Sequence, residues 1–554
     1  MQKGQNFLSI TRKEIENMGW KEVDVVLVSG DAYVDHPSFA VAVIGRILNK
    51  CGYRVGIITM PSWTDPSSIS IFGKPRLFFG VTSGNVDSMV ARYTAFKRFR
   101  NDDPYAPGGE AGLKPERAVI VYCNMIKAVY RDVPIVIGGI EASMRRVAHY
   151  DFWSNKIRRS IIKDSRADIL VYGMGERQVV TIAERLSSGF PLESIPGTVT
   201  ISRELPKNAQ LMPMEEEMIK SKEAFLEFYR QFYTNQHQVL VQKAGRGYLV
   251  HNPFEKDVTT EDLDEIYNLP FVRDVHPLYN RNVPAFDMIR NSITSHRGCV
   301  SGCSFCSLSL HQGKKIISRS PESIYREVKK IASDSNFRGH ITDIGGPSAN
   351  MYGISCKRNW RCSRESCTGM KLCENLRLKT KKWIDILDGA SSIKGVNLVT
   401  IGSGIRYDLF MRDNDSKNLL KAIISSHISG QLKIAPEHTC QNVLRSMRKT
   451  SLYKLDDFVR IFRDFTSNAG KRQHLIPYLM SCHPGCSMKD MKAMRNEIQS
   501  IFNFIPKQVQ AFIPLPLTIS SVIFYTGIDP LTRDRYSVTF DSEKRRKQHR
   551  VFFD

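Results

Sequence analysis

The stretch SHRGCVSGCSFCSL, residues 295–308, carries three cysteines in the spacing C-x3-C-x2-C: Cys299, Cys303 and Cys306. A structural zinc site is usually closed by four ligands, so three thiolates alone leave one coordination position open. Thiolates suit iron–sulfur clusters as well as zinc. On a four-iron cluster, three of them leave the fourth iron free to bind a small molecule. The alternative is a zinc ion completed by a remote histidine.

The cysteines come directly after the first strand of a repeated strand–helix pattern. Six strand-like runs follow one another at residues 291–298, 340–346, 397–405, 432–438, 474–482 and 509–515. Amphipathic stretches such as 321–333 and 455–465 separate them and predict helices. Six βα units in order predict a partial or complete parallel barrel, and chemistry in such barrels collects where the strands end. The three thiols lie at one of these strand ends.

A second alternating region precedes the barrel and predicts an open parallel sheet, a Rossmann-like α/β domain, with helices on both faces. Its strand candidates are residues 23–30, 54–59, 77–84, 118–123, 134–141 and 168–176, and its first helix is 39–53. Several of these strands end in glycines, where an open α/β sheet places a ligand crevice.

These patterns divide the chain into four parts. An N-terminal α/β domain covers 1–214, a helical connector 215–284, the barrel core 285–530 and a short basic tail 531–554. In the connector, residues 215–233 have helical periodicity and 259–269 begin with Thr/Asp capping chemistry. We expect the tail, with EKRRKQHR at 543–550, to be an exposed helix or a disordered segment.

Bulk composition narrows the class of protein. The 554-residue chain needs more than one core. No apolar run approaches the roughly 18 residues of a membrane-spanning helix, and the N-terminus lacks an apolar signal core, so we expect a cytoplasmic protein with no membrane contact. Twelve cysteines in that compartment indicate metal binding or catalysis rather than disulfides. The net charge of +23 fits either a polyanionic partner such as RNA or a solvated basic surface.

The cysteine motif C-x3-C-x-aromatic-C after a first barrel strand resembles the radical S-adenosylmethionine (SAM) superfamily. Five segments together are more closely similar to the YgiQ-type radical SAM proteins: 30–48, 138–153, 294–313, 432–439 and 508–516. The resemblance implies an N-terminal domain, a radical SAM core with a partial (β/α)6 barrel, and a C-terminal region that is short here. It defines the cofactor and the class of chemistry but no substrate, product or catalytic residue.

The resemblance also implies site residues. Cys299, Cys303 and Cys306 would hold a [4Fe-4S] cluster whose fourth iron chelates SAM. Five further residues at later strand ends are implied to shape the SAM pocket or to contact SAM or substrate: Gly345, Gly346, Ser403, Arg406 and Glu437. Pro347 stands where the superfamily usually has a glutamate after the paired glycines.

A second thiol group is the insertion CKRNWRCSRESCTGMKLC, whose spacing is C-x5-C-x4-C-x5-C. Its members are Cys356, Cys362, Cys367 and Cys373. Four thiols complete a tetrahedral zinc site or a fully ligated auxiliary cluster, so a structural or electron-relay role is expected. The spacing leaves zinc and iron–sulfur both open, and the alternative is four free thiols in a loop.

The N-terminal domain has a likeness to the cobalamin domains attached to some radical SAM enzymes. The base-off pattern D-x-H-x-x-G is absent, because Asp35 and His36 are adjacent and are followed by Pro37. We therefore expect no cobalt-ligating histidine. The domain is left to bind substrate or to shield the barrel, since a carbon radical must be kept from solvent.

Together these observations predict a radical SAM enzyme that cleaves SAM reductively and makes a 5′-deoxyadenosyl radical for an unidentified substrate. Such chemistry needs a low-potential electron donor, for which a flavodoxin- or ferredoxin-like protein is expected. Two alternatives remain: a radical SAM enzyme that modifies tRNA, and a non-catalytic metal-cluster protein that binds RNA through its basic surface.

Overall fold

The structure is a computed structural model that describes residues 7–254, 258–360, 362, 364, 366–449 and 455–554. The chain forms two compact units. The first contains Met1–Asp257 and Leu269–Arg290, and the second contains Val258–Asn268 and Asn291–Asp554. Each unit is described separately below.

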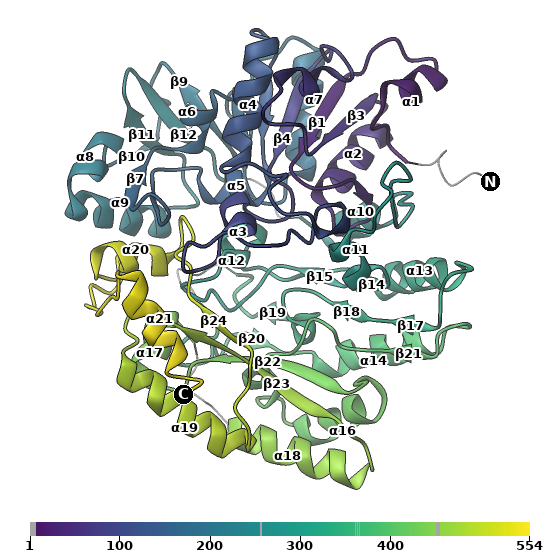
Figure 1. Ribbon diagram of the computed structural model, residues 1–554, viewed down its shortest axis with the longest axis vertical. Helices are drawn as coiled ribbons and strands as arrows, with labels where there is room; N and C mark the ends of the chain where they lie inside the picture. The colour runs from purple at the N-terminus through teal and green to yellow at the C-terminus, as the bar shows by residue number, and fades with distance from the viewer. Residues whose placement is uncertain (1–6, 255–257, 361, 363, 365, 450–454) are drawn as a thin grey trace. The chain divides into compact units, whose positions relative to one another are not determined.

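The first unit is built on a nine-stranded sheet (Figure 1). Its strands lie in the order β10 (Gln210–Met212), β11 (Leu240–Ala244), β12 (Gly247–His251), β9 (Thr198–Ser202), β8 (Ile169–Val171), β5 (Ile135–Ile137), β4 (Phe78–Thr82), β1 (Val25–Ser29) and β3 (Val55–Thr59). The strands from β3 to β8 pair in parallel, whereas β9 and β12 add antiparallel pairs. The predicted open parallel sheet is therefore confirmed, with an antiparallel extension.

Helices cover both faces of this sheet. Its helices are α1 (Arg12–Asn17), α2 (Ala40–Lys50), α3 (Ser88–Arg92), α4 (Ala118–Val129), α5 (Gly139–Met144), α6 (Ile161–Ser165), α7 (Glu176–Ser187), α8 (Glu215–Lys220), α9 (Lys222–Thr234) and α11 (Pro284–Ile289). Gly45 of α2 lies against Leu27 and Ile57, while α4 packs on the face that carries Val26 and Val28. Because both faces are covered, β1 is buried along its whole length.

One predicted strand of this unit is wrong. Residues 118–123 begin helix α4 rather than a strand. Ala118, Val119, Tyr122 and Cys123 are buried, and the intervening Ile120 and Val121 are only half-buried, which is helical spacing. A short continuous apolar run does not distinguish a strand from a buried helix. The packing of this segment against the sheet favours the helix.

The predicted helical connector is also corrected. The expected helices exist as α8, α9 and α10 (Thr260–Tyr267), and Thr259 caps α10 as predicted. However, residues 240–251 form β11 and β12, which join the first unit's sheet, whereas α10 belongs to the second unit. The segment is thus divided between the units, because its apolar LVQ and YLV runs form a hairpin around Gly245.

The second unit contains the predicted barrel. Its parallel strands are β14 (Ser292–Thr294), β17 (His340–Ile341), β18 (Asp343–Gly345), β21 (Leu398–Val399), β22 (Gln431–Glu437), β23 (His474–Ser481) and β24 (Val509–Ala511). β14 pairs with β18, β17 with β21, and β22 with β23 and then β24. A parallel bridge from Ile405, in the segment after β21, to Ile434 of β22 links the second of these groups to the third. The strands are therefore neighbours in chain order, as expected for a partial (β/α)6 barrel.

The helices of the second unit pack outside these strands around one large apolar core. Besides α10 they are α12 (Leu308–Gln312), α13 (Pro321–Ala332), α14 (Thr380–Ser391), α15 (Tyr407–Phe410), α16 (Ser416–Ser426), α17 (Gln441–Met447), α18 (Leu455–Asn468), α19 (Met488–Phe502), α20 (Ile519–Thr526) and α21 (Ser542–Arg550). No helix in the described ranges is both long and apolar enough to span a bilayer.

The C-terminal segment differs from the predicted exposed tail. Helix α21 packs on the barrel through Arg545, whose side chain is fully buried and whose Nη2 donates to the Phe512 carbonyl. Gln548 is buried as well and donates to the Cys486 carbonyl at 2.6 Å. The helix therefore has an exposed side, with Lys544 and Lys547, and a buried side, with Arg545 and Gln548. The basic composition of the run gave no indication that Arg545 faces the core.

Candidate functional site

The loop with three cysteines leaves the barrel after β14 and the short strand β15 (His296–Arg297), which pairs with β16 (Ile317–Ser318). Gly298 has φ +91°, and a Cβ there would lie 2.0 Å from the Lys315 carbonyl oxygen. The turn therefore requires glycine. Cys299 then donates its N–H to the Gly313 carbonyl at 3.1 Å, so the first thiol is held at a defined point of the strand end.

Ser304 fixes the middle of the loop to two distant helices. Its N–H and its hydroxyl donate to the carbonyls of Met447 and Ser446 in α17, at 3.0 and 2.6 Å. Its own carbonyl accepts the N–H of Ser520 in α20 at 2.9 Å, and the two serine hydroxyls lie 2.7 Å apart. The Ser520 hydroxyl also contacts His483 Nε2 at 2.7 Å. The spacing of the thiols thus depends on tertiary contacts as well as on the loop sequence.

All three thiols are half-buried. Burial raises the pKa of the Cys306 thiol, and the neighbouring thiols of Cys303 and Cys299 raise it further. Burial likewise raises the pKa of Cys303, while the cations Lys449 and Arg406 oppose that shift. The raised pKa values of Cys303 and Cys306 favour the neutral thiol until a positive group stabilises the thiolate, which a bound metal does. Within the described residues, no three Cys, His, Asp or Glu side chains stand ready to ligate one metal ion.

Two of the predicted residues, Arg406 and Glu437, lie close enough to Cys303 for their charges to affect the pKa of its thiol. Arg406 is buried in an ion pair with Asp408, and its Nη1 donates to the Ser301 hydroxyl at 2.5 Å. Glu437 ends β22 with φ +69°, and its Oε1 lies 3.6 Å from Lys449 Nζ. Burial raises the pKa of Glu437, and the charges of Lys449 and Arg406 act against it.

The other predicted residues meet at the ends of β18 and β21. Ile344 packs in the core, so its neighbours Asp343 and Gly345 face the opposite side, toward the barrel interior. Asp343 Oδ1 accepts the N–H groups of Gly402 and Ser403, at 2.8 and 3.0 Å, and the Ser403 hydroxyl at 3.1 Å. A Cβ on Gly345 would lie 2.1 Å from that hydroxyl. Gly345 is therefore a point of close approach between the ends of β18 and β21.

Asp343 and Lys449 are site residues that sequence reasoning missed. Burial raises the pKa of Asp343 to about 6, although the hydrogen bonds from Ser403 and Gly402 lower it. The available signal for Asp343 was its position two residues before Gly345, on the same face of a strand. Lys449 follows α17 and carries no motif, so only the fold shows it. The last of the predicted residues is Gly346. A Cβ added at Gly346 would lie 2.7 Å from the ring of His296.

The second thiol group lies beside the first. Cys367 and Cys373 are buried in an apolar cluster that includes Val300, and Cys299 packs against that cluster. Cys367 donates its N–H to the Val300 carbonyl at 2.9 Å. Burial raises the pKa of Cys367 to about 11, with the thiols of Cys373 and Cys362 adding to the shift. Cys367 and Cys373 therefore share one apolar cluster next to the Cys299 loop, whereas the Cys362 thiol is exposed.

The fourth thiol of this group closes the insertion. Cys356 lies in β19 (Ser355–Cys356), which pairs antiparallel with β20 (Leu376–Arg377). Leu376 donates its N–H to the Cys373 carbonyl at 3.2 Å, and Cys373 donates to the Cys367 carbonyl at 2.8 Å. The hairpin thus brings the two ends of the insertion together.

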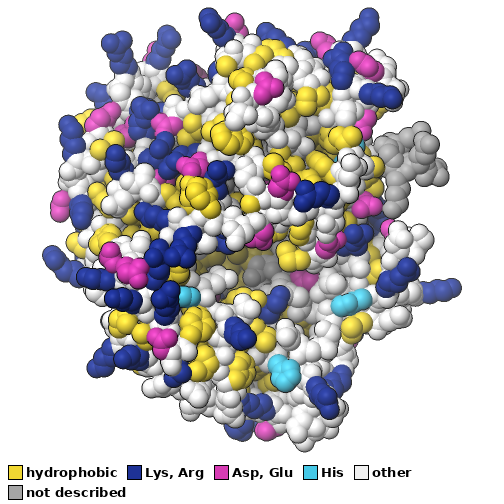
Figure 2. Space-filling model, viewed as in Figure 1, with side chains coloured by type: hydrophobic (Ala, Val, Ile, Leu, Met, Phe, Trp, Pro, Cys, Tyr) yellow, Lys and Arg dark blue, Asp and Glu magenta, His cyan; other side chains and the backbone are white. Residues whose placement is uncertain are grey.

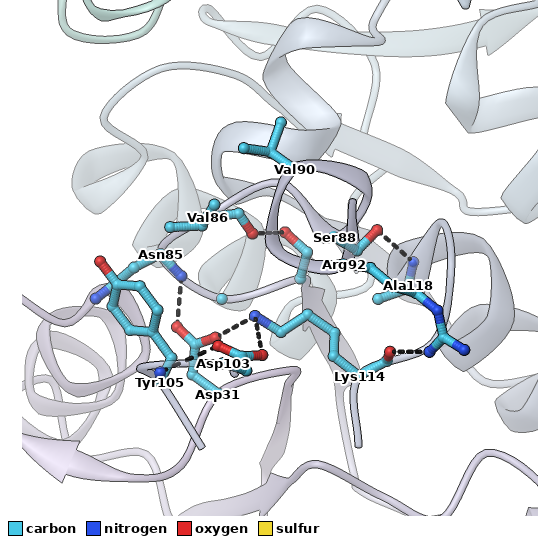
Figure 3. A network of polar contacts seen from close by, with 12 residues as sticks. Asp31, Asn85, Val86, Ser88, Val90, Arg92, Asp103, Tyr105, Lys114 and Ala118 are labelled. Carbon is cyan, nitrogen blue, oxygen red and sulfur yellow. Dashed lines mark hydrogen bonds and ion pairs between the residues drawn. The ribbon is translucent and has the colours of Figure 1, made fainter. Parts of the chain in front are cut away.

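In the first unit, the strand order from β3 to β8 is 2-1-3-4-5, which places a ligand crevice between the ends of β1 and β4. The protein's own side chains fill this position (Figure 3). Asn85 donates its N–H to Asp31 Oδ2 at 2.6 Å, and Lys114 Nζ lies 2.6 Å from Asp31 and 3.8 Å from Asp103. A Cβ on Gly30 would lie 2.4 Å from the Ser83 carbonyl oxygen. The two strand ends are therefore in direct contact.

Two carboxylates, Asp31 and Asp103, balance the charge of the buried Lys114. Burial alone would lower the pKa of Lys114, but the carboxylates of Asp31 and Asp103 raise it, so the side chain is charged. His36, the only histidine near the expected pattern, is fully buried in its own turn, and its Nδ1 accepts the Ser38 N–H at 3.1 Å. These residues do not fit a cobalamin held between β1 and β4 through a histidine.

Comparison with known proteins places the chain in a family. The profile described as Radical SAM N-terminal matches residues 7–292. A UPF0313 protein of Methanocella arvoryzae is 45% identical over 549 residues, covering 97% of this chain and 91% of the relative. A UPF0313 protein of Clostridium botulinum strain 657 is 42% identical, covering 98% and 87%. The chain belongs to the UPF0313 family of radical SAM proteins. This confirms the resemblance to YgiQ-type proteins.

One solved structure shares the fold of this UPF0313 protein. It is the radical S-adenosylmethionine methyltransferase TsrM from Kitasatospora setae with cobalamin and a [4Fe-4S] cluster bound. The TM-score is 0.52 at 14% identity, over 89% of this chain and 74% of that one. The likeness confirms the fold class.

The closed crevice leads to a stability prediction. Replacing Lys114 by Ala should lower the free energy of unfolding by about 3–5 kcal/mol, because it leaves the buried carboxylates of Asp31 and Asp103 without a counter-ion. Lys74→Ala, at an exposed position of the same unit, should change it by less than about 0.5 kcal/mol. Denaturant unfolding measures both.

The same assay tests the crevice as a cofactor site, since a ligand that binds the folded state raises its stability. Excess cobalamin should leave the unfolding midpoint of the wild-type protein unchanged. A midpoint raised by cobalamin, and no longer raised in the His36→Ala variant, would contradict this account.

Proposed function

We propose that this UPF0313 protein is an enzyme that cleaves SAM reductively and directs the resulting radical at a substrate held in the barrel. The observation that carries the proposal is the anchored loop of three half-buried thiols at the carboxyl end of a parallel (β/α)6 barrel. Cys299, Cys303 and Cys306 would hold a [4Fe-4S] cluster, and their donor set fits one because three thiolates leave one iron open. A bound cluster supplies the single electron that converts SAM to methionine and a 5′-deoxyadenosyl radical.

The chain's own residues hold and shape this site. Ser304 fixes the loop through α17 and α20, and Arg406 fixes it through the Ser301 hydroxyl at 2.5 Å. Arg406 is occupied by Asp408, so we assign it to positioning the loop. Glu437 and Lys449 lie close to Cys303 at the end of β22 and are the polar groups we assign to SAM or substrate.

Asp343 is the group we assign to a cationic or hydrogen-donating part of SAM or substrate. Its Oδ1 takes three hydrogen bonds, whereas Oδ2 has none within the described ranges. The side chain faces the barrel interior, and the lack of a side chain at Gly345 lets the Ser403 hydroxyl approach it. Pro347 provides no carboxylate after the paired glycines, so Asp343 supplies the negative charge at this strand end.

The reaction needs an external reductant, for which we propose a low-potential carrier of the flavodoxin or ferredoxin class. We place the reaction in the cytoplasm, because free thiols and a cluster of this type require a reducing compartment.

The first prediction concerns SAM cleavage. Anaerobically reconstituted and chemically reduced protein should form 5′-deoxyadenosine and methionine from SAM. Cys303→Ala should abolish turnover, because the cluster loses one of only three protein ligands. Cys51→Ala, an exposed cysteine, should retain it. Undiminished cleavage by the Cys303 variant would refute the assignment.

Asp343 gives a pH prediction. A carboxylate is ionised above its pKa, so wild-type activity should fall as the pH drops through about 6. Asp343→Asn should lower kcat/KM at pH 8 by about ten- to a hundredfold, the value of a hydrogen bond to a charged group, and should remove that acid limb. Asp385→Asn, an exposed carboxylate on α14, is the control. A variant with the wild-type pH profile would show that Asp343 does not bind the reacting groups.

We propose in addition that Cys356, Cys362, Cys367 and Cys373 bind their own metal, either one zinc or a fully ligated cluster. Two observations support this proposal: Cys367 and Cys373 are buried together beside Val300, and the hairpin of β19 and β20 joins the two ends of the insertion.

Metal content tests the second site. With Cys299, Cys303 and Cys306 all replaced by Ala, the protein should retain about one zinc or about four irons per chain. Adding Cys367→Ala and Cys373→Ala should remove that metal. A folded triple variant without metal would contradict the proposal.

A further inference from the structure

The insertion that carries the second thiol group has a strongly charged outer surface. The insertion, residues 356–373, contains five Lys or Arg and one Glu, a net charge of +4, and the following residues 374–382 add four Lys or Arg and one Glu. The whole chain of 554 residues carries +23. We call six exposed basic residues between 357 and 379 the insertion face: Lys357, Arg358, Arg364, Lys371, Arg377 and Lys379. Lys and Arg are also spread broadly over the side of the molecule drawn in Figure 2. The distinguishing feature of this segment is that its charge lies on a segment in contact with the loop of three thiols.

Three cations of this face lack a carboxylate partner within the part of the chain that the structure describes. They are Lys357, Arg358 and Lys371. Arg364 uses its guanidinium for the carbonyls of Ser366 and Lys371, at 3.1 and 2.9 Å. Unpaired surface cations of this density attract an acidic partner and accelerate its association.

The insertion touches the thiol loop directly. Cys367 donates its N–H to the Val300 carbonyl at 2.9 Å, and the Ser366 hydroxyl donates to the carbonyl of Ser301. Cys299 packs against the apolar cluster that contains Cys367 and Cys373. A partner bound on the insertion face is therefore connected to the Cys299–Cys306 loop through a single packed segment.

We propose that the insertion face is the docking surface for an acidic electron-carrier protein of the flavodoxin class. This inference rests on the proposed function, because that reaction needs one electron for each SAM cleaved. The reduced carrier is oxidised by one electron, and that electron enters SAM as its S–C5′ bond breaks into methionine and the adenosyl radical. Charge complementarity positions the carrier beside the insertion, whose thiols lie next to the catalytic loop.

An RNA partner fits this face less well. Single-stranded RNA is usually bound by a cationic groove together with aromatic rings on which bases stack. Trp360 is the one aromatic residue in 356–382, and its side chain packs against the apolar cluster. The face therefore offers charge without a stacking platform, which suits a folded acidic surface.

The test compares two reductants. The variant Lys357→Glu/Arg358→Glu/Lys371→Glu should form 5′-deoxyadenosine at least about tenfold more slowly than wild type when reduced flavodoxin is the donor at low salt. With dithionite, which needs no docking surface, the two rates should agree within about twofold. A matched control, Lys544→Glu/Lys547→Glu/Arg550→Glu on the exposed side of α21, changes the charge equally and should behave as wild type with both donors.

Salt gives a second readout. The flavodoxin-driven rate of wild type should fall as ionic strength rises, because the attraction is screened, and that of the insertion variant should be nearly flat. Equal flavodoxin-driven rates in wild type and the insertion variant would overturn the proposal. So would loss of binding to a single-stranded RNA oligonucleotide with unchanged response to flavodoxin, since the surface would then serve RNA.

The failures of the two proposals are separable. If wild type does not cleave SAM even with dithionite, the proposed function fails. Docking is then decided by direct titration of flavodoxin onto wild type and the insertion variant. Tighter binding to wild type supports the surface, and equal binding excludes it.

Discussion

The hydrogen bonds that hold Ser304 between α17 and α20 are the constraint on which the site depends. Three thiols with one spacing have many conformations in an isolated loop. Here the loop is fixed from the outside, by the carbonyls of Ser446 and Met447 on one side and by Ser520 on the other. These partners lie more than 140 residues away in sequence, so the thiols take their positions only after the whole barrel has formed.

Charged side chains surround the anchored thiols at the carboxyl ends of the barrel strands. Burying thiols raises their pKa, which opposes thiolate formation, and two buried cations partly offset that effect at Cys303. Lys449 and Arg406 are themselves held by Glu437 and Asp408. Asp343 stands apart from these pairs at the end of β18, with one carboxylate oxygen committed to the loop after β21. The strand ends thus contain two ion pairs and, among the described residues, one Asp343 oxygen that accepts no hydrogen bond.

Much of this arrangement could be predicted from sequence, for physical reasons that differ between elements. Barrel strands such as 397–405 and 509–515 were predictable because each is an apolar run bounded by polar or glycine residues. The first strand, within 291–298, has Ile293 as its one apolar residue, so its prediction depended on the cysteine motif that follows it. Residues 118–123 were mistaken for a strand because a continuous apolar run has no distinguishing period. The hairpin at 240–251 was missed between two helices, and the buried role of Arg545 was hidden in a basic run. Asp343 was within reach of sequence reasoning, since it shares a strand face with Gly345. Lys449 was not, because its role arises only from the approach of α17 to the cysteine loop.

The central claim is that three thiolates hold a four-iron cluster with one iron left for SAM. Mössbauer spectroscopy of protein reconstituted with ⁵⁷Fe, in a variant with Ala at Cys356, Cys362, Cys367 and Cys373, tests it most directly. The account predicts four irons per chain, of which one site alone changes its isomer shift when SAM is added. A spectrum in which SAM alters none of the irons, or in which the protein retains no cluster although it is folded, would contradict the account.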